Sequence, residues 1–115
     1  QWAKKAYETY PTNPFYIVTY FKSLVRDKTT SDEQLIFLID QLKSAWDVNR
    51  ATLSQMLEAE YEYFRNMNFH EALIMYRNAL KKNPYYPIFI SASEICEISG
   101  HHDEIAKLAK EFGFN

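Results

Sequence analysis

Two stretches of the sequence carry side chains that could bind a metal ion or work as acids and bases. The run from His101 to Glu104 holds two histidines and two carboxylates, all potential metal ligands. Neighbouring residues of a helix point about 100° apart, so the two histidines cannot easily share one ion. Glu58, Glu60 and Glu62 are two residues apart, a spacing that sends helical side chains to different faces. We therefore expect no metal, no cofactor and no catalytic carboxylate pair at either stretch.

A third stretch, residues 65–70, reads Arg-Asn-Met-Asn-Phe-His and resembles the Arg-Asn-x3-His signature of the HEPN ribonucleases. The resemblance implies that His70 transfers a proton and that Arg65 stabilises the charge on an RNA phosphate. The same residues also fit an ordinary turn between helices, in which Asn68 caps and Phe69 packs. Because the pattern around this short string is longer and better matched, we expect no catalytic residue here and keep the ribonuclease as an alternative.

The composition indicates one folded domain with few tight turns. The 115 residues are 47% hydrophobic and 24% charged, which fits a globular protein rather than a disordered chain. Average usage would give about eight glycines, and this chain has two. Rossmann folds, P-loop enzymes and β-sandwiches are disfavoured, because their loops and hairpins depend on glycine. The single cysteine, Cys96, excludes an internal disulfide and fits a reducing compartment.

Helix start and stop signals divide the chain into seven helical stretches, and no stretch requires a strand. Asn13 is followed by proline, and Ser31 and Asn68 each begin a capping box with Gln or Glu three residues further on. Gly100 and Gly113 end the last two helices. Short connections make successive helices antiparallel, so we predict an all-α fold. The predicted helices span about 2–10, 14–26, 32–46, 50–66, 69–82, 87–99 and 102–112.

An internal repeat is the most informative pattern in the sequence. Pro-x-x-Pro segments at 11–14 and 84–87 each follow one helix and begin the next, about two lengths of a 34-residue repeat apart. Between them lie a bulky residue, an aromatic residue at the turn and an Ala-x3-aromatic-x2-Ala run, which the first proline of the second segment closes. These residues are Tyr63, Phe69, Ala72, Tyr76, Ala79 and Pro84. In order and spacing the chain resembles the tetratricopeptide repeat family.

This resemblance implies a right-handed α-solenoid of helix pairs. Ala72 and Ala79 would let the second helix of a pair approach the first closely. The family places a small residue where Phe21 and Glu60 stand, so we expect those pairs to be rotated or spaced further apart. We expect a fragment of a larger protein whose single domain, 1–115, has a half repeat at 1–12 and repeats at about 13–48, 49–86 and 87–115.

In the family, the first helices of successive pairs line a concave groove that binds a peptide or a helix. The resemblance implies a non-catalytic interaction or scaffold module, whose partner is a protein, a peptide or another domain of the parent chain. A structural spacer or homodimerisation unit is the second alternative, beside the ribonuclease. The expected partner-binding residues are Phe15, Val18, Lys22, Leu57, Tyr61, Arg65, Ile90 and Glu94.

The sequence predicts no membrane or nucleic-acid partner and a cytoplasmic location. The longest apolar run, Phe15 to Phe21, is broken by Thr19 and falls short of the roughly 18 residues that a membrane span needs. The net charge of −2 offers no basic field for nucleic acid. No secretory signal precedes the first predicted helix.

Overall fold

The computed structural model describes residues 2–44 and 48–114. Within these ranges the protein has seven α helices and no strand, which confirms the predicted all-α fold. None of the described helices is long and apolar enough to cross a membrane. The predicted third helix reaches Trp46, which lies outside the described residues, and the other ends fall within two residues of the prediction. The helices are α1 (Trp2–Thr9), α2 (Pro14–Val25), α3 (Asp32–Lys43), α4 (Val48–Phe64), α5 (Phe69–Lys82), α6 (Tyr86–Ile98) and α7 (His102–Phe112).

Asparagine and serine side chains cap three of these helices, as predicted. Asn13 Oδ1 accepts hydrogen bonds from two N–H groups in the first turn of α2, at 2.9 and 3.3 Å. Ser31 Oγ accepts from the N–H of Gln34 in α3, and Asn68 Oδ1 accepts from the N–H of Glu71 in α5, both at 3.2 Å. These bonds satisfy N–H groups that have no partner within the helix, and so fix where each helix begins.

The two predicted capping boxes are wrong in their second half. Within the described residues no hydrogen bond joins the Ser31 N–H to the Gln34 side-chain oxygen, and Gln34 Nε2 donates to the Tyr20 hydroxyl at 3.1 Å, which ties α3 to α2. The N–H of Asn68 donates to the Glu62 carbonyl at 3.2 Å, so it is already satisfied by the end of α4. The caps are therefore one-sided, because the Gln34 side chain contacts α2 and the Asn68 N–H belongs to the end of α4.

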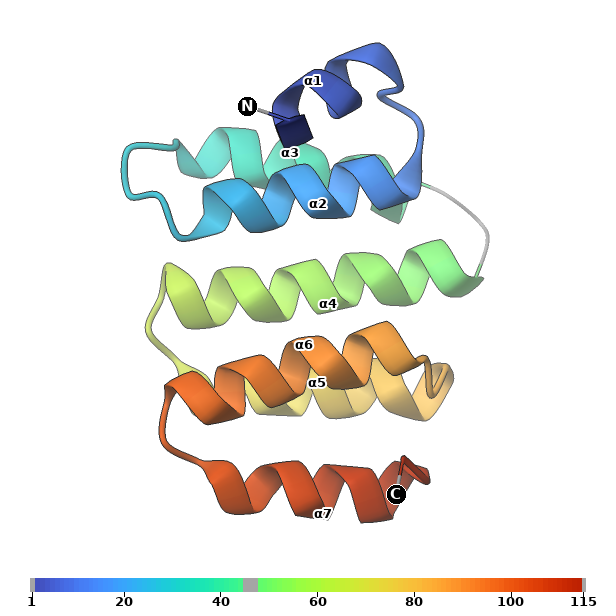
Figure 1. Cartoon of the computed structure of the whole chain (residues 1–115), viewed down its shortest axis with the longest axis vertical. Helices are drawn as coiled ribbons and strands as arrows, with labels where there is room; N and C mark the ends of the chain where they lie inside the picture. Colours follow the sequence, from blue (N-terminus) through green and yellow to red (C-terminus); the bar gives the residue numbers. More distant parts are fainter. Residues whose placement is uncertain (1, 45–47, 115) are drawn as a thin grey trace.

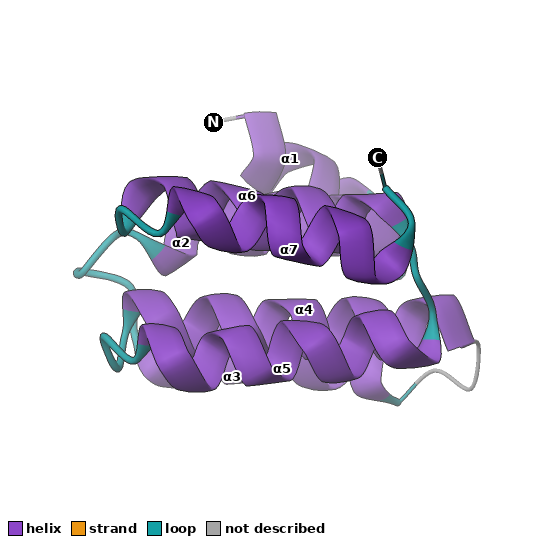
Figure 2. Ribbon diagram, turned by 90° about the horizontal axis from the view of Figure 1, so that it is seen from below, coloured by secondary structure: helices purple, strands orange, loops and turns teal. Residues whose placement is uncertain are grey.

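The helices form two layers, and α4 occupies the centre. Each helix packs against the next along the chain, and in addition α2 packs against α4 and α4 against α6. Figure 1 shows α2, α4 and α6 in succession along the longest axis of the molecule, which measures 39 × 30 × 21 Å. In Figure 2, α2, α6 and α7 lie in one layer, whereas α3, α4 and α5 lie in the other. Helix α4 is therefore set back between α2 and α6.

Small side chains sit where α5 meets the rest of the core. Ala72 and Ala79 are completely buried on α5, as is Ala59 on α4. Their methyl groups leave room for a facing helix, and the larger side chain of Tyr76 on α5 is also buried, with 1% of its surface exposed. The closely packed pair of α4 and α5 thus forms the rigid support behind the surface that α2, α4 and α6 share.

Candidate functional site

A groove runs between α2 and α6, with α4 as its floor. Its volume is about 540 Å³, within the range of about 300–1,000 Å³ that is typical of ligand pockets. The two views agree that α2 and α6 lie on one side of the molecule with α4 set back between them (Figures 1 and 2). We call this hollow the α2–α6 groove. Its lining residues are Pro14, Phe15, Val18, Thr19, Lys22, Leu53, Met56, Tyr85, Tyr86, Pro87, Ile90, Ser91 and Glu94.

The end of the groove beside the first turns of α2 and α6 is aromatic and apolar. Phe15 and Tyr86 expose 65% and 57% of their surface, and Ile90 exposes 37%. Leu53 and Met56 line the floor beneath them. Single exposed apolar residues are ordinary, but a contiguous set that lines a hollow is typical of an interface. This end can bury an apolar side chain of a partner.

The opposite end of the groove contains a chain of polar side chains that crosses four helices. Lys22 of α2 forms an ion pair with Oε1 of Glu60 on α4. Ser91 Oγ of α6 donates a hydrogen bond to the same Oε1 at 2.8 Å, and Tyr76 of α5 bonds to Ser91 Oγ at 2.8 Å. Since the serine proton is used on Glu60, the Tyr76 hydroxyl is the donor to Ser91. We call these four residues the polar chain.

Burial keeps Tyr76 protonated, and the polar chain directs its hydroxyl through Ser91 towards one carboxylate. Burial, followed by the negative charge of Glu60, raises the pKa of Tyr76 well above its ordinary value of 10.0. Because Tyr76 keeps its proton, its hydroxyl can donate to Ser91 Oγ, while the Ser91 proton is donated to Glu60. Glu60 exposes 4% of its surface, so its charge depends on these partners rather than on bulk water.

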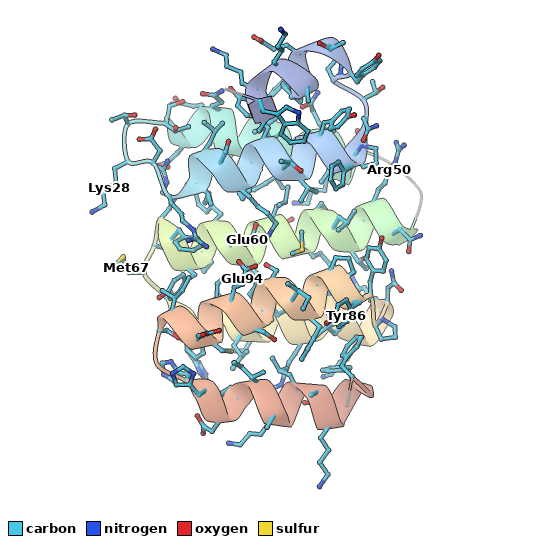
Figure 3. All side chains as sticks on the ribbon, viewed as in Figure 1. Lys28, Arg50, Glu60, Met67, Tyr86 and Glu94 are labelled. Carbon is cyan, nitrogen blue, oxygen red and sulfur yellow. The ribbon has the colours of Figure 1, made fainter. Side chains whose placement is uncertain are left out.

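A smaller hollow of about 70 Å³ adjoins the polar end of the groove, shares Lys22 and Glu94 with it, and is also lined by Glu60. The Arg26 guanidinium lies 4.7 Å from the centre of the Phe64 ring and 3.8 Å from Glu94 Oε2. Figure 3 shows Glu60 on α4 and Glu94 on α6 facing the same space between their helices. The polar end thus brings two carboxylates from different helices to one small hollow.

Five of the eight predicted partner-binding residues line the α2–α6 groove. They come from both walls, and all lie within the expected stretches of the first helices in the repeat pattern. Their placement gives the groove a gradient from aromatic at one end to charged at the other. These five residues are Phe15, Val18, Lys22, Ile90 and Glu94.

The three predicted residues on α4 do not line the groove, which corrects the mapping of this helix. Leu57 is completely buried in the core. Tyr61 is half-buried and lines a different hollow, between α3, α4 and α5, and Arg65 points to the connection between α2 and α3. The groove instead meets Leu53, Met56 and, at the small hollow, Glu60. This face is rotated by about 100° from the predicted one, as expected for a register that is off by one residue.

Arg65 and His70, the residues of the ribonuclease alternative, have separate surroundings. Arg65 Nε donates to the carbonyl of Val25 at 3.0 Å, and Nη2 donates to the carbonyls of Asp27 and Thr30 at 2.7 and 2.9 Å. The other terminal nitrogen, Nη1, donates to Asp32 Oδ1 at 3.3 Å. The guanidinium therefore holds the α2–α3 connection. His70 is an exposed residue in the first turn of α5.

No family model, curated protein or solved structure matches this chain. The function is therefore inferred from the α2–α6 groove. Its aromatic end offers apolar contact area, and its polar end offers hydrogen-bond acceptors on a rigid support. This combination of a few polar groups with a mainly apolar lining is suited to binding.

Proposed function

We propose that this protein is a non-catalytic interaction module that binds a peptide segment of a partner in the α2–α6 groove. One observation carries the proposal: exposed aromatic and aliphatic side chains from two separate helices line one hollow of about 540 Å³. Large, rigid side chains such as Phe15 and Tyr86 give much contact area for little loss of conformational entropy, which makes them typical binding anchors.

The proposed architecture behind this groove is a right-handed α-solenoid of tetratricopeptide-like pairs, α2–α3, α4–α5 and α6–α7, preceded by α1. The packing of successive helices supports it, as do the contacts of α2 with α4 and of α4 with α6. In such an arrangement the first helix of each pair faces the inner surface, and α2, α4 and α6 line the groove. Because α4 is set back into the layer of α3 and α5, the proposed pairs are rotated relative to those of a regular solenoid.

The ribonuclease alternative has weaker support. The Nε and Nη2 groups of Arg65 donate hydrogen bonds to backbone carbonyls at the α2–α3 connection, so they are not available to an RNA phosphate. The alternative of a homodimerisation unit would place a second copy of the chain in the same groove. It differs from the proposal in one measurable way, because the molecular mass in solution would then depend on the groove residues.

A peptide-display selection tests the proposal. Random peptides of about 16 residues are selected on the protein, and their dissociation constants are measured for the wild type, for a Phe15→Ala, Ile90→Ala variant and for Phe37→Ala. Phe37 is the matched control, since it exposes 59% of its surface on α3, outside the groove. We expect the double variant to bind at least about tenfold more weakly, and the control to bind like the wild type.

Two results would contradict the proposal. Selected peptides that bind the double variant as well as the wild type would place binding outside the groove. A concentration-dependent dimer that the double variant abolishes, together with a selection that yields no peptide, would identify the groove as a homodimer interface. Sedimentation of both proteins distinguishes these cases.

A further inference from the structure

Glu60 has a carboxylate oxygen to which none of the described residues donates a hydrogen bond. Its Oε1 atom accepts hydrogen bonds from both Lys22 and Ser91, whereas Oε2 has no hydrogen-bond partner among the described residues. The side chain is 95% buried. A buried acceptor without a donor is costly, and such atoms in native proteins are few. Glu60 lines the small hollow at the polar end of the groove, where Oε2 itself is covered, so a donor from outside reaches it only when a lining side chain moves aside.

A second carboxylate borders the same hollow and is only weakly engaged. Glu94 Oε2 lies 3.8 Å from Arg26, and both side chains are 55% exposed, so this pair contributes little and exchanges readily with water. The hollow of about 70 Å³ has room for an ammonium group or for two waters of about 30 Å³ each. The group that fits both oxygens is a donor with a positive charge.

We propose that the groove selects an extended peptide with an apolar side chain and, three or four residues away, a lysine or arginine whose cation binds between Glu60 Oε2 and Glu94. This inference rests on the proposed function and names the chemistry of its partner. Tyr86 and Glu94 are eight residues apart on α6, so the aromatic and acidic ends are separated by about 12 Å. An extended chain advances about 3.3 Å per residue, which sets the spacing of the two peptide side chains.

The charges around the hollow disfavour an acidic peptide. Two basic residues also line the hollow, and both are engaged: Lys22 is paired with Glu60, and Arg26 lies over the Phe64 ring and 3.8 Å from Glu94 Oε2. A carboxylate from a partner would face the free oxygen of Glu60 and the charge of Glu94 together. A cation instead completes the hydrogen bonding of the polar end, and its alkyl stem extends along the apolar lining of the groove.

A peptide array tests the inference. Each eight-residue peptide has a fixed phenylalanine, mixed neutral residues at the other positions, and Lys, Arg, Gln or Glu three or four residues after the phenylalanine. Fluorescence anisotropy of the best pools gives dissociation constants. We expect the Lys and Arg pools to bind at least about tenfold more tightly than the Gln pools, and the Glu pools to bind most weakly.

Three variants assign this selectivity to the acidic end. Glu94→Gln removes an exposed charge, so the fold is retained, and we expect it to lower the preference for Lys over Gln about threefold to tenfold. Glu60→Gln, checked for folding by circular dichroism, should lower it as well. Glu97→Gln is the matched control, because Glu97 is an exposed residue of α6 outside the groove, and it should leave the preference unchanged.

The outcomes separate this inference from the proposed function. Equal binding of the Lys and Gln pools, or tighter binding of the Glu pools, would overturn the charge selectivity and leave peptide binding in the groove intact. A Lys preference that persists in Glu94→Gln and Glu60→Gln would place the cation elsewhere and also overturn it. Failure of every pool to bind would contradict both statements.

Discussion

At the scale of single residues, the ion pair of Lys22 and Glu60 joins two side chains with different access to water. The Lys22 side chain is 37% exposed and can be solvated alone, whereas the Glu60 side chain is 5% exposed and cannot. A buried charge that loses its partner destabilises the fold, although replacing both partners by apolar residues is often neutral. The stability of the polar chain therefore depends unequally on its two charged members.

Replacing Lys22 alone should destabilise the protein more than replacing both partners. We expect Lys22→Met to lower the free energy of unfolding by about 2 kcal/mol, below the usual range for buried pairs because Lys22 is partly exposed. The double variant Lys22→Met, Glu60→Met should regain most of this loss. Urea denaturation measures all three proteins. A single variant as stable as the wild type would show that Glu60 does not depend on Lys22.

The ionisation of the Cys96 thiol makes the free energy of unfolding depend on pH in the alkaline range. Burial raises the pKa of its thiol from 9.0 to about 11. The unfolded chain loses this proton near pH 9 and the folded chain only near pH 11, so the folded state binds more protons within this window and its stability falls as the pH rises. Below pH 9 the contribution is fully present.

The Cys96→Ala variant isolates this contribution. We expect the free energy of unfolding of the wild type to fall more steeply than that of Cys96→Ala between pH 9 and 11, by about 1–2 kcal/mol in total. Urea denaturation at several pH values within and below this window gives both slopes. Parallel slopes for the two proteins would mean that the thiol ionises equally in the folded and unfolded chains.

At the scale of elements, α4 and α5 form the closest helix contact of the described residues, and Ala72 is completely buried on α5. We expect Ala72→Leu to lower the free energy of unfolding by about 1–3 kcal/mol, because the added atoms have no space in this contact. Ala106→Leu is the control, since Ala106 is exposed on α7 and should change stability little. Urea denaturation compares the two, and equal effects would show that α5 does not pack closely through Ala72.

The α2–α3 connection depends on Arg65 at the end of α4. We expect Arg65→Met to accelerate amide hydrogen exchange in residues 26–30 more than tenfold and to lower the free energy of unfolding by about 1–3 kcal/mol. Lys28→Met is the control, because Lys28 lies in the same connection and extends into solvent (Figure 3). An arginine that served RNA cleavage would leave exchange unchanged and its loss would abolish the cleavage.

The helices and their caps could be predicted from local signals, whereas the face of α4 could not. Asn13, Ser31 and Asn68 act through bonds within one turn, so the sequence alone indicates them. By contrast, α4 packs against α2, α3, α5 and α6, and it buries polar residues such as Thr52 and Glu60. A helix that is covered on most sides has no clear apolar stripe, so periodicity cannot identify its groove-facing side.

At the scale of the whole molecule, α4 and α5 form the central support and α1 lies at the edge. Within the described residues α1 has eight residues, a single buried side chain, and its main packing contact with α2. We expect amide hydrogen exchange to be fastest among the helices in α1 and slowest in α4 and α5. Mass-spectrometric exchange measures this order, and slow exchange throughout α1 would show that the fold opens as one unit.

The polar chain also limits how this sequence can diverge. Lys22, Glu60, Ser91 and Tyr76 come from four helices, and each satisfies the next. A substitution at one of these positions alone removes a hydrogen bond or an ion pair from a buried group of the polar chain. Descendants of this gene are therefore expected to keep all four residues or to replace them together with apolar ones, and paired changes at these sites would reveal the fold in an alignment of distant copies.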